Sequence, residues 1–542
     1  MFTQYLSVTR TCKVFCFTKM DKKEKLWLKA KGYLHLTPQI DITKNKKTII
    51  SKVTNPEFVS TYAFYPLIHS ILKERRYKRK DSNSSERAHS YRNENGEPVR
   101  NIKLRPLHYS THLDALIFGY YADLLQSHYE KRIQEHVGLS ESIIAYRRIP
   151  TSEGKSNKST IHFAKEVFDE IKNRSKQGSD CIVLTFDIKS FFSSLNHELL
   201  KSIWADILGV SHLPKDHLNV FKASTRFSYI LHEDLCRHTK NGCERKGYDE
   251  GHLAHIRNRL GKQSLFSSPK EFRDKVKSGE VRIHKYPFRD KITKKPIGIP
   301  QGLPISAVLA NMYLFSFDLS ILNELVKKSN VFYRRYSDDL FIICTTSNAT
   351  YVETFVTNAL QESFVQISKD KTEKFIFKQS ILGNTEPRLL SYKYLSDGTL
   401  KVAPVTYLGF EFNGKNAFIK STNLAKYYRR VISCVKRKAR RAKKMAEKDY
   451  GQKPVIYRRQ LYKLCNDPNL KRIKVHSNWK KIVKHSNGEF RVVSEKKTKL
   501  FKSNYLTYVN RASRIMEEPA IINQFKKHKL IFNQAIQRHL KK

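Results

Sequence analysis

Two adjacent carboxylates, Asp338 and Asp339, stand out among the residues that could do chemistry. They lie between two apolar runs, residues 331–336 and 340–344, whose composition is typical of strands. This pattern predicts a β-hairpin with both acids at its tip. Neighbouring negative charges repel each other unless they share a cation, and Mg²⁺ prefers carboxylate and phosphate oxygens. An acidic turn in solvent is the alternative interpretation, because Asp is a common turn residue.

A third carboxylate, Asp187, lies at the end of the apolar run 181–188, directly before Ile188. This run predicts a buried strand. If that strand lies beside the hairpin, Asp187 meets Asp338 and Asp339. Phosphoryl transfer from a nucleoside triphosphate needs two metal ions roughly 4 Å apart, held by carboxylates from separate elements. The three acids therefore predict a site for two Mg²⁺ ions, with Mn²⁺ as an alternative.

The composition indicates a polyanionic partner. The chain has 542 residues and a formal net charge of +52, which opposes compaction unless a polyanion is bound. Nucleic acid fits, because neutralised phosphates release counterions. An anionic membrane surface is the alternative, but no apolar run approaches the ~20 residues that span a bilayer. Basic residues interrupt the first 20 residues too early for a secretory signal, and the eight scattered cysteines suit a reducing cytoplasm.

The elements that would position the acids can be read from periodicity. Apolar spacing predicts helices over residues 112–136, 160–174, 306–325 and 351–365. Residues 237–295 are polar and read as irregular. The tail from 413 to 542 has 36 Lys and Arg residues against 7 Asp and Glu residues, a net charge of +29. We expect basic helices facing nucleic acid there, with solvated basic helices as the alternative.

These motifs resemble those of reverse transcriptases, and they occur in the family's order. The similar segments are 105–107 with Asp114 (the fingers motif of prokaryotic members), 184–192 (motif A), 298–311 (motif B), 336–339 (Tyr-x-Asp-Asp, motif C), 364–372 (motif D) and 407–410 (motif E). The resemblance implies an α+β right-hand polymerase with fingers, palm and thumb and a basic α-helical C-terminal domain. Its implied parts are the N-terminal region and start of the fingers (1–94), the fingers and palm (95–420) with an insertion at about 206–295, and the thumb and C-terminal extension (421–542).

The resemblance also implies a role for each matching residue. Asp187 and Asp338 would be metal ligands together with the carbonyl of Ile188, and Asp339 would be an intermittent ligand. Lys371 would protonate the leaving pyrophosphate as a general acid.

Five further residues are implied in nucleotide binding. Arg105 would hold the triphosphate, with a surface salt bridge as its alternative role. Phe192 would exclude a ribose 2′-hydroxyl, and core packing is its alternative. Gln301 and Gly302 would let the backbone approach the nucleotide and template, since Gly lacks a Cβ, and Ile188 would add its carbonyl. Lys103 and Arg147 are weaker candidates for phosphate contact.

A subgroup is suggested by residues 145–147 and 191–197, which look like the bacterial defence-associated reverse transcriptases. That group implies an RNA-directed DNA polymerase in antiphage defence, with dNTPs as substrates, a DNA product and often a structured noncoding RNA as partner. The alternatives are a group II intron, mobile-element or retron-type enzyme and a non-enzymatic RNA-binding scaffold, against which the intact acids argue. Whether the protein forms a homo-oligomer stays open.

Overall fold

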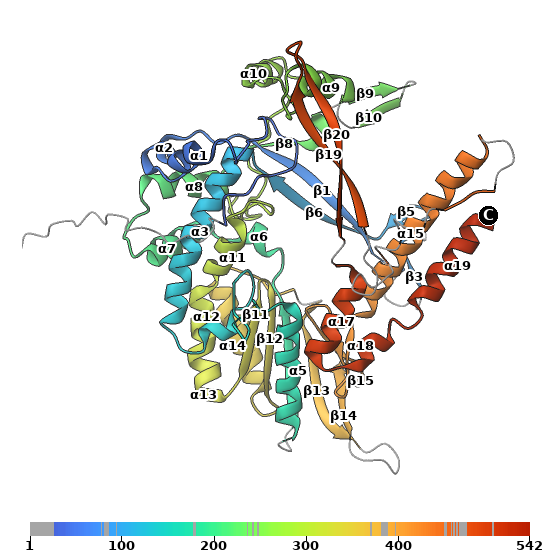
Figure 1. Cartoon of the computed structure of the whole chain (residues 1–542). Coiled ribbons are helices and arrows are strands. Elements are labelled where there is room, and N and C mark those ends of the chain that lie inside the picture. Colours follow the sequence, from blue (N-terminus) through green and yellow to red (C-terminus); the bar gives the residue numbers. More distant parts are fainter. Residues whose placement is uncertain are drawn as a thin grey trace, which may run out of the picture.

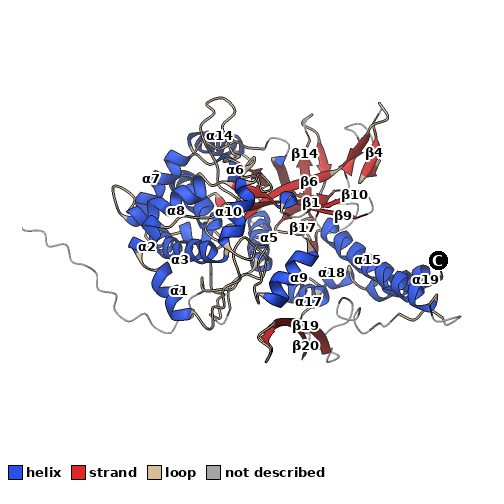
Figure 2. Ribbon diagram, turned by 90° about the horizontal axis from the view of Figure 1, so that it is seen from above, coloured by secondary structure: helices blue, strands red, loops and turns tan. Residues whose placement is uncertain are grey.

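The described part of the chain combines helices and strands, and more of its residues lie in helices than in strands (Figures 1 and 2). The computed structural model describes residues 26–541 except for 77, 81–85, 94, 155, 177–179, 236, 241–242, 247–248, 369–370, 381–387, 396, 449–452, 457, 459–460, 462–463, 465–473 and 501–502. Within these described ranges, no helix is both long enough and apolar enough to cross a membrane.

A six-stranded antiparallel sheet, which we call the central sheet, lies between two hydrophobic cores and is seen in the lower half of Figure 1. Its strands, in spatial order, are β11 (Phe332–Tyr336), β12 (Asp339–Thr345), β7 (Cys181–Asp187), β13 (Glu373–Ser380), β14 (Arg388–Tyr394) and β15 (Leu400–Val402). Both the strand over 181–188 and the hairpin over 331–344 are thereby confirmed. Because β7 inserts between β12 and β13, a strand from far upstream lies directly beside the acidic hairpin.

The two faces of this sheet belong to two separate cores. Ile182, Leu184 and Phe186 of β7 join the first core, whereas Cys181 and Val183 join the second. This alternation follows from the strand geometry, in which successive side chains point to opposite faces. The run therefore reads as continuously apolar because both faces are covered.

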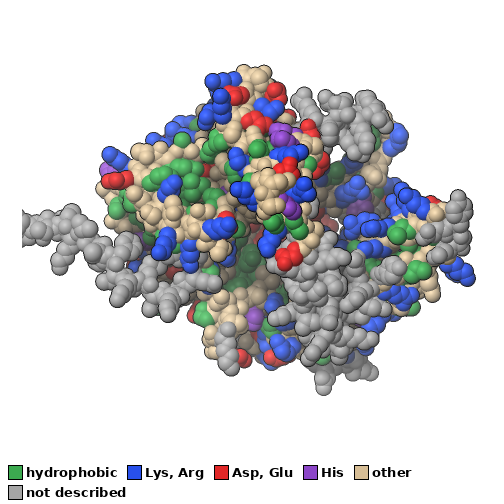
Figure 3. All heavy atoms as spheres, turned by 45° about the horizontal axis from the view of Figure 1, so that its top comes forward, with side chains coloured by type: hydrophobic (Ala, Val, Ile, Leu, Met, Phe, Trp, Pro, Cys, Tyr) green, Lys and Arg blue, Asp and Glu red, His purple; other side chains and the backbone are tan. Residues whose placement is uncertain are grey.

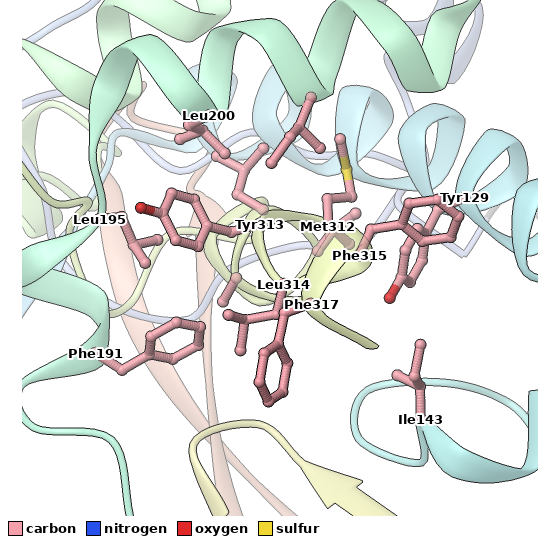
Figure 4. Packing of buried hydrophobic residues seen from close by; sticks show 14 of the residues in the cluster. Tyr129, Ile143, Phe191, Leu195, Leu200, Met312, Tyr313, Leu314, Phe315 and Phe317 are labelled. Atoms are coloured by element: carbon pink, nitrogen blue, oxygen red, sulfur yellow. The ribbon is translucent and has the colours of Figure 1, made fainter. Parts of the chain in front are cut away.

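Helices cover the first face. They are α3 (His112–Gln134), α4 (Leu139–Ser142), α6 (Phe191–Ser194), α7 (His197–Leu208), α11 (Ser306–Tyr313), α12 (Phe315–Ile321), α13 (Lys327–Ser329) and α14 (Ala349–Glu362). The predicted helix over 306–325 is present but is divided between α11 and α12 and ends in a π-helical turn, Leu322–Val326. Figure 4 shows Phe191, Leu195 and Leu200 packed around Tyr313 of α11.

The second face is covered by α5 and by a small sheet. The helix α5 (Thr160–Lys176) confirms the prediction over 160–174. The small sheet consists of β16 (Val405–Tyr407), β17 (Phe410–Phe412) and β18 (Ala417–Ile419). The rings of Phe168 and Phe412 stack between them at 4.9 Å.

A long strand pair leaves this body toward the C-terminal helices (Figure 1). It consists of β1 (Leu67–Arg75) and β6 (Ile102–Tyr109), and β8 (Tyr229–Leu231) pairs in parallel with the start of β1. The pairs β2 (Lys78–Arg79) with β3 (Arg87–Ala88), and β4 (Ser90–Arg92) with β5 (Pro98–Arg100), lie between them in sequence. Upstream, α1 (Lys46–Val53) and α2 (Pro56–Thr61) lie near α8 (Lys215–Thr225), and Asn219 of α8 donates to the Val59 carbonyl.

Residues 237–295, which were expected to be irregular, contain regular elements. These are β9 (Arg237–Lys240), β10 (Cys243–Lys246), α9 (Glu250–Arg259) and α10 (Pro269–Lys277). Asp249 and Ser268 cap the two helices by accepting hydrogen bonds from backbone amides, a recognisable start signal in the sequence. Leu253 and Ile256 of α9 pack with Ile68 of β1 and Ile230 of β8 in a third core.

The prediction of a basic α-helical C-terminal domain agrees with the structure only in part. Helices are present: α15 (Ser421–Ala446), α17 (Tyr505–Met516), α18 (Pro519–Asn523) and α19 (His528–Lys541). Between α15 and α17, however, β19 (Lys474–Lys484) and β20 (Phe490–Leu500) form a long antiparallel hairpin. Its β-branched pair Ile482 and Val492 favours strands, and Asn487-Gly488, with Gly488 at φ +82°, favours a tight turn.

Candidate active site

The structure brings the three predicted acids together at one end of the central sheet. Asp187, the last residue of β7, pairs in register with Asp339, the first residue of β12. The amide of Ile188 donates to the Asp338 carbonyl at 3.1 Å. The turn between β11 and β12 therefore lies against the end of β7, as predicted.

The acidic turn is held in a strained conformation. Ser337 has φ +60°, a backbone angle that residues other than glycine rarely adopt, and its side chain is buried. Beneath it, the fully buried Arg335 forms an ion pair with the fully buried Asp318 of α12, with Nη2 and Oδ2 2.5 Å apart. The Arg335 guanidinium also donates to the Ser337 carbonyl at 3.4 Å and the Asn311 carbonyl at 3.3 Å. This network ties the turn to α11 and α12.

Burial and mutual repulsion act on the paired carboxylates. Burial raises the pKa of Asp339 to about 6, and the charges of Asp338 and Asp187 add to this effect. Burial is also the largest cause that raises the pKa of Asp338, followed by the charge of Asp187. Lys371 opposes both shifts. Ionisation of Asp338 and Asp339 is therefore disfavoured chiefly by burial, and the neighbouring carboxylates add to that cost.

The segment that contains Lys371 runs beside the end of β7. The amide of Ser368 donates to the Asp187 carbonyl at 2.7 Å, and the amide of Lys189 donates to the Gln366 carbonyl at 2.7 Å. The ammonium group of Lys371 forms an ion pair with the Asp187 carboxylate. Residues 369 and 370 of this predicted segment lie outside the described residues.

A group of cations on β6 and on neighbouring segments lies near the acids. Burial lowers the pKa of Lys103, and the charges of Arg105, Arg76 and Lys371 lower it further, whereas Asp187 opposes the shift. The structure therefore clusters two predicted phosphate candidates, Lys103 and Arg105, with Lys371. Arg76 was not singled out from the sequence, although it lies in a visibly basic run.

Gly302 lies where the backbone of its own segment contacts the backbone of β6. A Cβ there would meet the His108 carbonyl oxygen at 2.4 Å, and the residue has φ +119°. The carbonyl of its neighbour Gln301 accepts from the His108 amide at 2.8 Å. Glycine is thus required by contact with β6. The structure does not place Gln301 or Gly302 against a nucleotide, so that role remains a prediction.

Phe192 is half-buried at the edge of the first core. Its ring lies 5.9 Å from that of Phe191, and its carbonyl accepts from the Ile299 amide at 2.6 Å. These contacts fix Phe192 between the segments that follow β7 and precede α11. The position is compatible with both predicted roles, packing and exclusion of a 2′-hydroxyl.

Three predicted polar residues have structural partners. Arg147 is 3% exposed and is engaged by the Glu130 carboxylate at 2.6 Å, so its guanidinium is not offered to a phosphate. Asp114 is buried and accepts from the Tyr62 hydroxyl at 2.7 Å. Arg105 is 46% exposed and lies 3.5 Å from Glu74. Of the two arginines, Arg105 is the one whose guanidinium is exposed.

The acids fit a divalent cation by their chemistry. All donors are oxygens, which Mg²⁺ prefers, and a cation would stabilise the ionised carboxylates that burial disfavours. Within the described ranges, no three side chains of the types His, Cys, Asp or Glu are placed so that they could together hold a metal ion. In this structure the Lys371 ammonium occupies one side of Asp187 instead.

Comparisons with known proteins agree with this chemistry. A family model described as "Reverse transcriptase (RNA-dependent DNA polymerase)" matches residues 275–412. This range contains Asp338, Asp339 and Lys371, whereas Asp187 lies upstream and joins them through the sheet. Enzymes of this family use divalent metal ions. A comparison with curated proteins gives no match.

The solved structures that are similar to this chain include telomerases. The chain is 12% identical to apo telomerase from Candida tropicalis truncated from its C-terminal domain, with a TM-score of 0.35, over 60% of this chain and 53% of that one. It is 10% identical to telomerase from Candida albicans in complex with a TWJ fragment of telomeric RNA, with a TM-score of 0.32, over 69% and 49%. The chain thus spans about half the length of these telomerase chains.

Residues 275–412 therefore match the reverse transcriptase family model, and this stretch carries the acidic hairpin found in the sheet.

Proposed function

We propose that this chain copies RNA into DNA by metal-assisted nucleotidyl transfer, and that Asp187, Asp338 and Asp339 form its catalytic centre. The observation that carries the proposal is the register of β7 and β12, which pairs Asp187 with Asp339 beside a turn anchored by a buried ion pair. In this proposal the six-stranded sheet is the palm, the β1–β6 side is the fingers, and α15 begins the thumb.

The chain's own residues would divide the work. Asp187 and Asp338, with the carbonyl of Ile188, would hold two Mg²⁺ or Mn²⁺ ions, and Asp339 would join them intermittently. The bound ions supply Lewis-acid chemistry, which lowers the pKa of the primer 3′-hydroxyl and stabilises charge on the phosphoryl group. The 3′-hydroxyl would release its proton to solvent, and its oxygen would form a bond to the α-phosphorus as the bond to the bridging oxygen of pyrophosphate breaks. Lys371 would donate a proton to that leaving oxygen.

Substrate positioning would fall to the remaining predicted residues. Arg105 and the neighbouring Lys103 would hold the triphosphate, because cations cluster there beside Asp187. Gln301 and Gly302 would bring the backbone close to the nucleotide, and Phe192 would favour a deoxyribose.

Substitution of both hairpin acids tests the catalytic proposal. We expect Asp338→Ala/Asp339→Ala to abolish dNTP incorporation on a primed RNA template, while the protein still folds and binds RNA. Asp397→Ala, at an exposed loop position, is the matched control and should keep wild-type activity. Incorporation that survives the double substitution would contradict the proposal.

We further propose that the enzyme acts in bacterial antiphage defence, in the cytoplasm, with a structured noncoding RNA as template or cofactor. Support comes from the resemblance of residues 145–147 and 191–197 to the defence-associated group. Sequencing the nucleic acid that copurifies with the protein should recover one structured RNA and its DNA copy. In phage plating assays, cells with the wild-type gene should resist infection and cells with Asp338→Ala/Asp339→Ala should not. Recovery of intron RNA with splicing activity would instead favour a mobile-element enzyme.

A further inference from the structure

Four parts of the chain close into a ring of contacts, which we call the collar. Its sides are the β1–β6 pair, the helix α9, the β19–β20 hairpin, and α15 with α17. In Figure 1 the hairpin stands between the C-terminal helices and α9, and the view in Figure 2 places it on the opposite side of these helices from β1 and β6. Each junction between the sides is made by identifiable residues.

The hairpin joins α9 through its tip. Arg259, at the end of α9, forms an ion pair with Glu489, next to the start of β20. The ring of Phe490 lies on the backbone of Gly261, where a Cβ would come within 2.6 Å of Phe490 Cδ1. Gly261 also has φ +63°, so the residue at this junction suits both the turn and the contact.

The opposite junction joins β1 to α15. The Lys426 ammonium of α15 lies 2.6 Å from the Glu74 carboxylate of β1, and Arg105 of β6 approaches the same carboxylate at 3.5 Å. Arg429 Nη1 lies 3.0 Å from His89 Nε2. Polar contacts at the surface therefore tie β1, and the excursion between β1 and β6 that carries His89, to the long basic helix.

The remaining junctions are apolar and firm. Ile68 of β1 packs with Ile256 of α9 in the third core. At the root of the hairpin, β20 ends at Leu500 and α17 begins at Tyr505, whose ring stacks on Tyr427 of α15 at 4.4 Å. The collar thus has two junctions within packed cores and two at its surface, where exposed ion pairs act together with the contact of Phe490 on Gly261 at the tip. The exposed junctions can open without loss of a core.

The collar borders the candidate active site and is basic. Lys103 of β6 and Lys420, directly before α15, both act on the pKa values of the acids. Exposed cations lie on several of its sides: Lys73, Arg75, Arg430, Lys481, Lys484 and Arg491. Figure 3 shows Lys and Arg side chains gathered over the C-terminal helices beside a hollow that separates them from the rest of the molecule.

We propose that the collar encircles the template strand, with the hairpin as a strap that opens at Arg259–Glu489 to admit it. This inference rests on the proposed polymerase function, because it assigns the enclosed polyanion to the template. An encircled strand leaves only when the strap opens or when a free end slides through. A circular template therefore stays bound longer than a linear one of the same sequence.

The test compares two dissociation rates of the protein: from a primed circle of single-stranded RNA, and from the same RNA after linearisation. Both are measured after addition of excess unlabelled RNA as competitor. In the wild type, the circle should outlast the linear strand by about tenfold. Arg259→Glu and Glu489→Arg should each bring the ratio of lifetimes close to one, and the swapped double variant should restore it. The two single substitutions change the net charge in opposite directions. A general effect of charge would therefore change their ratios of lifetimes in opposite directions.

Lys270→Glu on α10 makes the same charge change as Arg259→Glu and should leave the ratio unchanged. Equal lifetimes on circle and linear strand in the wild type would overturn the proposal, as would a ratio that neither single substitution alters. No nucleotide is incorporated in this assay. The Asp338→Ala/Asp339→Ala variant should keep the wild-type ratio, so failure of the strap and failure of the catalytic proposal give different results.

Discussion

At the residue scale, substitution of Phe192 can distinguish a packing role of its ring from a role in selecting the sugar of the substrate. Its backbone carbonyl is engaged by Ile299, so Phe192→Ala removes the ring and keeps that hydrogen bond. We expect the variant to accept ribonucleotides, because the space that the ring occupies would admit a 2′-hydroxyl. The ratio of kcat/KM for dNTP over rNTP should fall about a hundredfold.

Phe364→Ala is the control for this substitution, since it removes the same ring at a position that is 63% exposed. Its sugar discrimination should equal that of the wild type. If Phe192→Ala lowers stability and leaves the ratio unchanged, then core packing is the whole role of Phe192.

Asp114 has a pH dependence whose sign can be worked out. Burial raises its pKa to about 6 from an ordinary value of 3.8. The folded state therefore holds the proton more tightly than the unfolded state, and stability falls as pH rises from about 4 to about 6. Full ionisation costs about 3 kcal/mol, since one pKa unit corresponds to about 1.4 kcal/mol.

Comparison with Asp114→Asn isolates this contribution, because Asn keeps an acceptor for the Tyr62 hydroxyl without a charge. The free energy of unfolding should be measured by denaturant titration at pH 4, 5, 6 and 7. We expect the wild type to lose stability relative to the variant as pH rises through this range. A difference between the two proteins that stays constant with pH would show that Asp114 remains ionised throughout.

At the element scale, the acidic hairpin depends on the pair formed by Arg335 and Asp318. Arg335→Met leaves the buried Asp318 carboxylate without its partner and should cost about 3–5 kcal/mol of stability. Adding Asp318→Asn removes the stranded charge and keeps an acceptor for the Tyr333 hydroxyl. The double variant should therefore be more stable than Arg335→Met alone, as measured by denaturant unfolding. Simple additivity of the two effects would contradict this account.

The sequence predicts local elements better than it predicts the contacts between them. The strand ending at Asp187 and the hairpin carrying Asp338 were both predicted, because apolar runs bounded by acids are local signals. The ion pair of Asp318 with Arg335 was not predicted. Its one visible trace is a lone acid inside an apolar helix, and its partner lies 17 residues away on another element.

The C-terminal hairpin is an element whose secondary structure itself was not predicted from the sequence. Its strands lie in a region whose charge density masks the alternation of β-branched residues, so the region was predicted as basic helices and the hairpin was not predicted. The tip finds its partner on α9, more than 200 residues upstream. A contact of this range leaves no periodic pattern in the sequence, and only the fold reveals it.

At the scale of the whole molecule, the net charge of +52 should appear as a steep salt dependence of nucleic-acid binding. Each phosphate neutralised on a single strand contributes about 0.7 to the slope of log K against log salt. If α15 lies along the strand, Gln at the exposed residues Lys436, Arg437, Arg440 and Arg441 should lower that slope by about 3. Binding is measured by fluorescence anisotropy between about 50 and 300 mM salt.

The control for α15 carries the same charge change at the other end of the molecule. Lys44, Lys46, Lys47 and Lys52 are exposed in and beside α1, which lies far from α15 in Figure 1. Their replacement by Gln should leave the slope near that of the wild type, because screening confines the influence of exposed charges to about 10 Å. Equal slopes for the two quadruple variants would mean that total charge, and not the path along α15, governs binding.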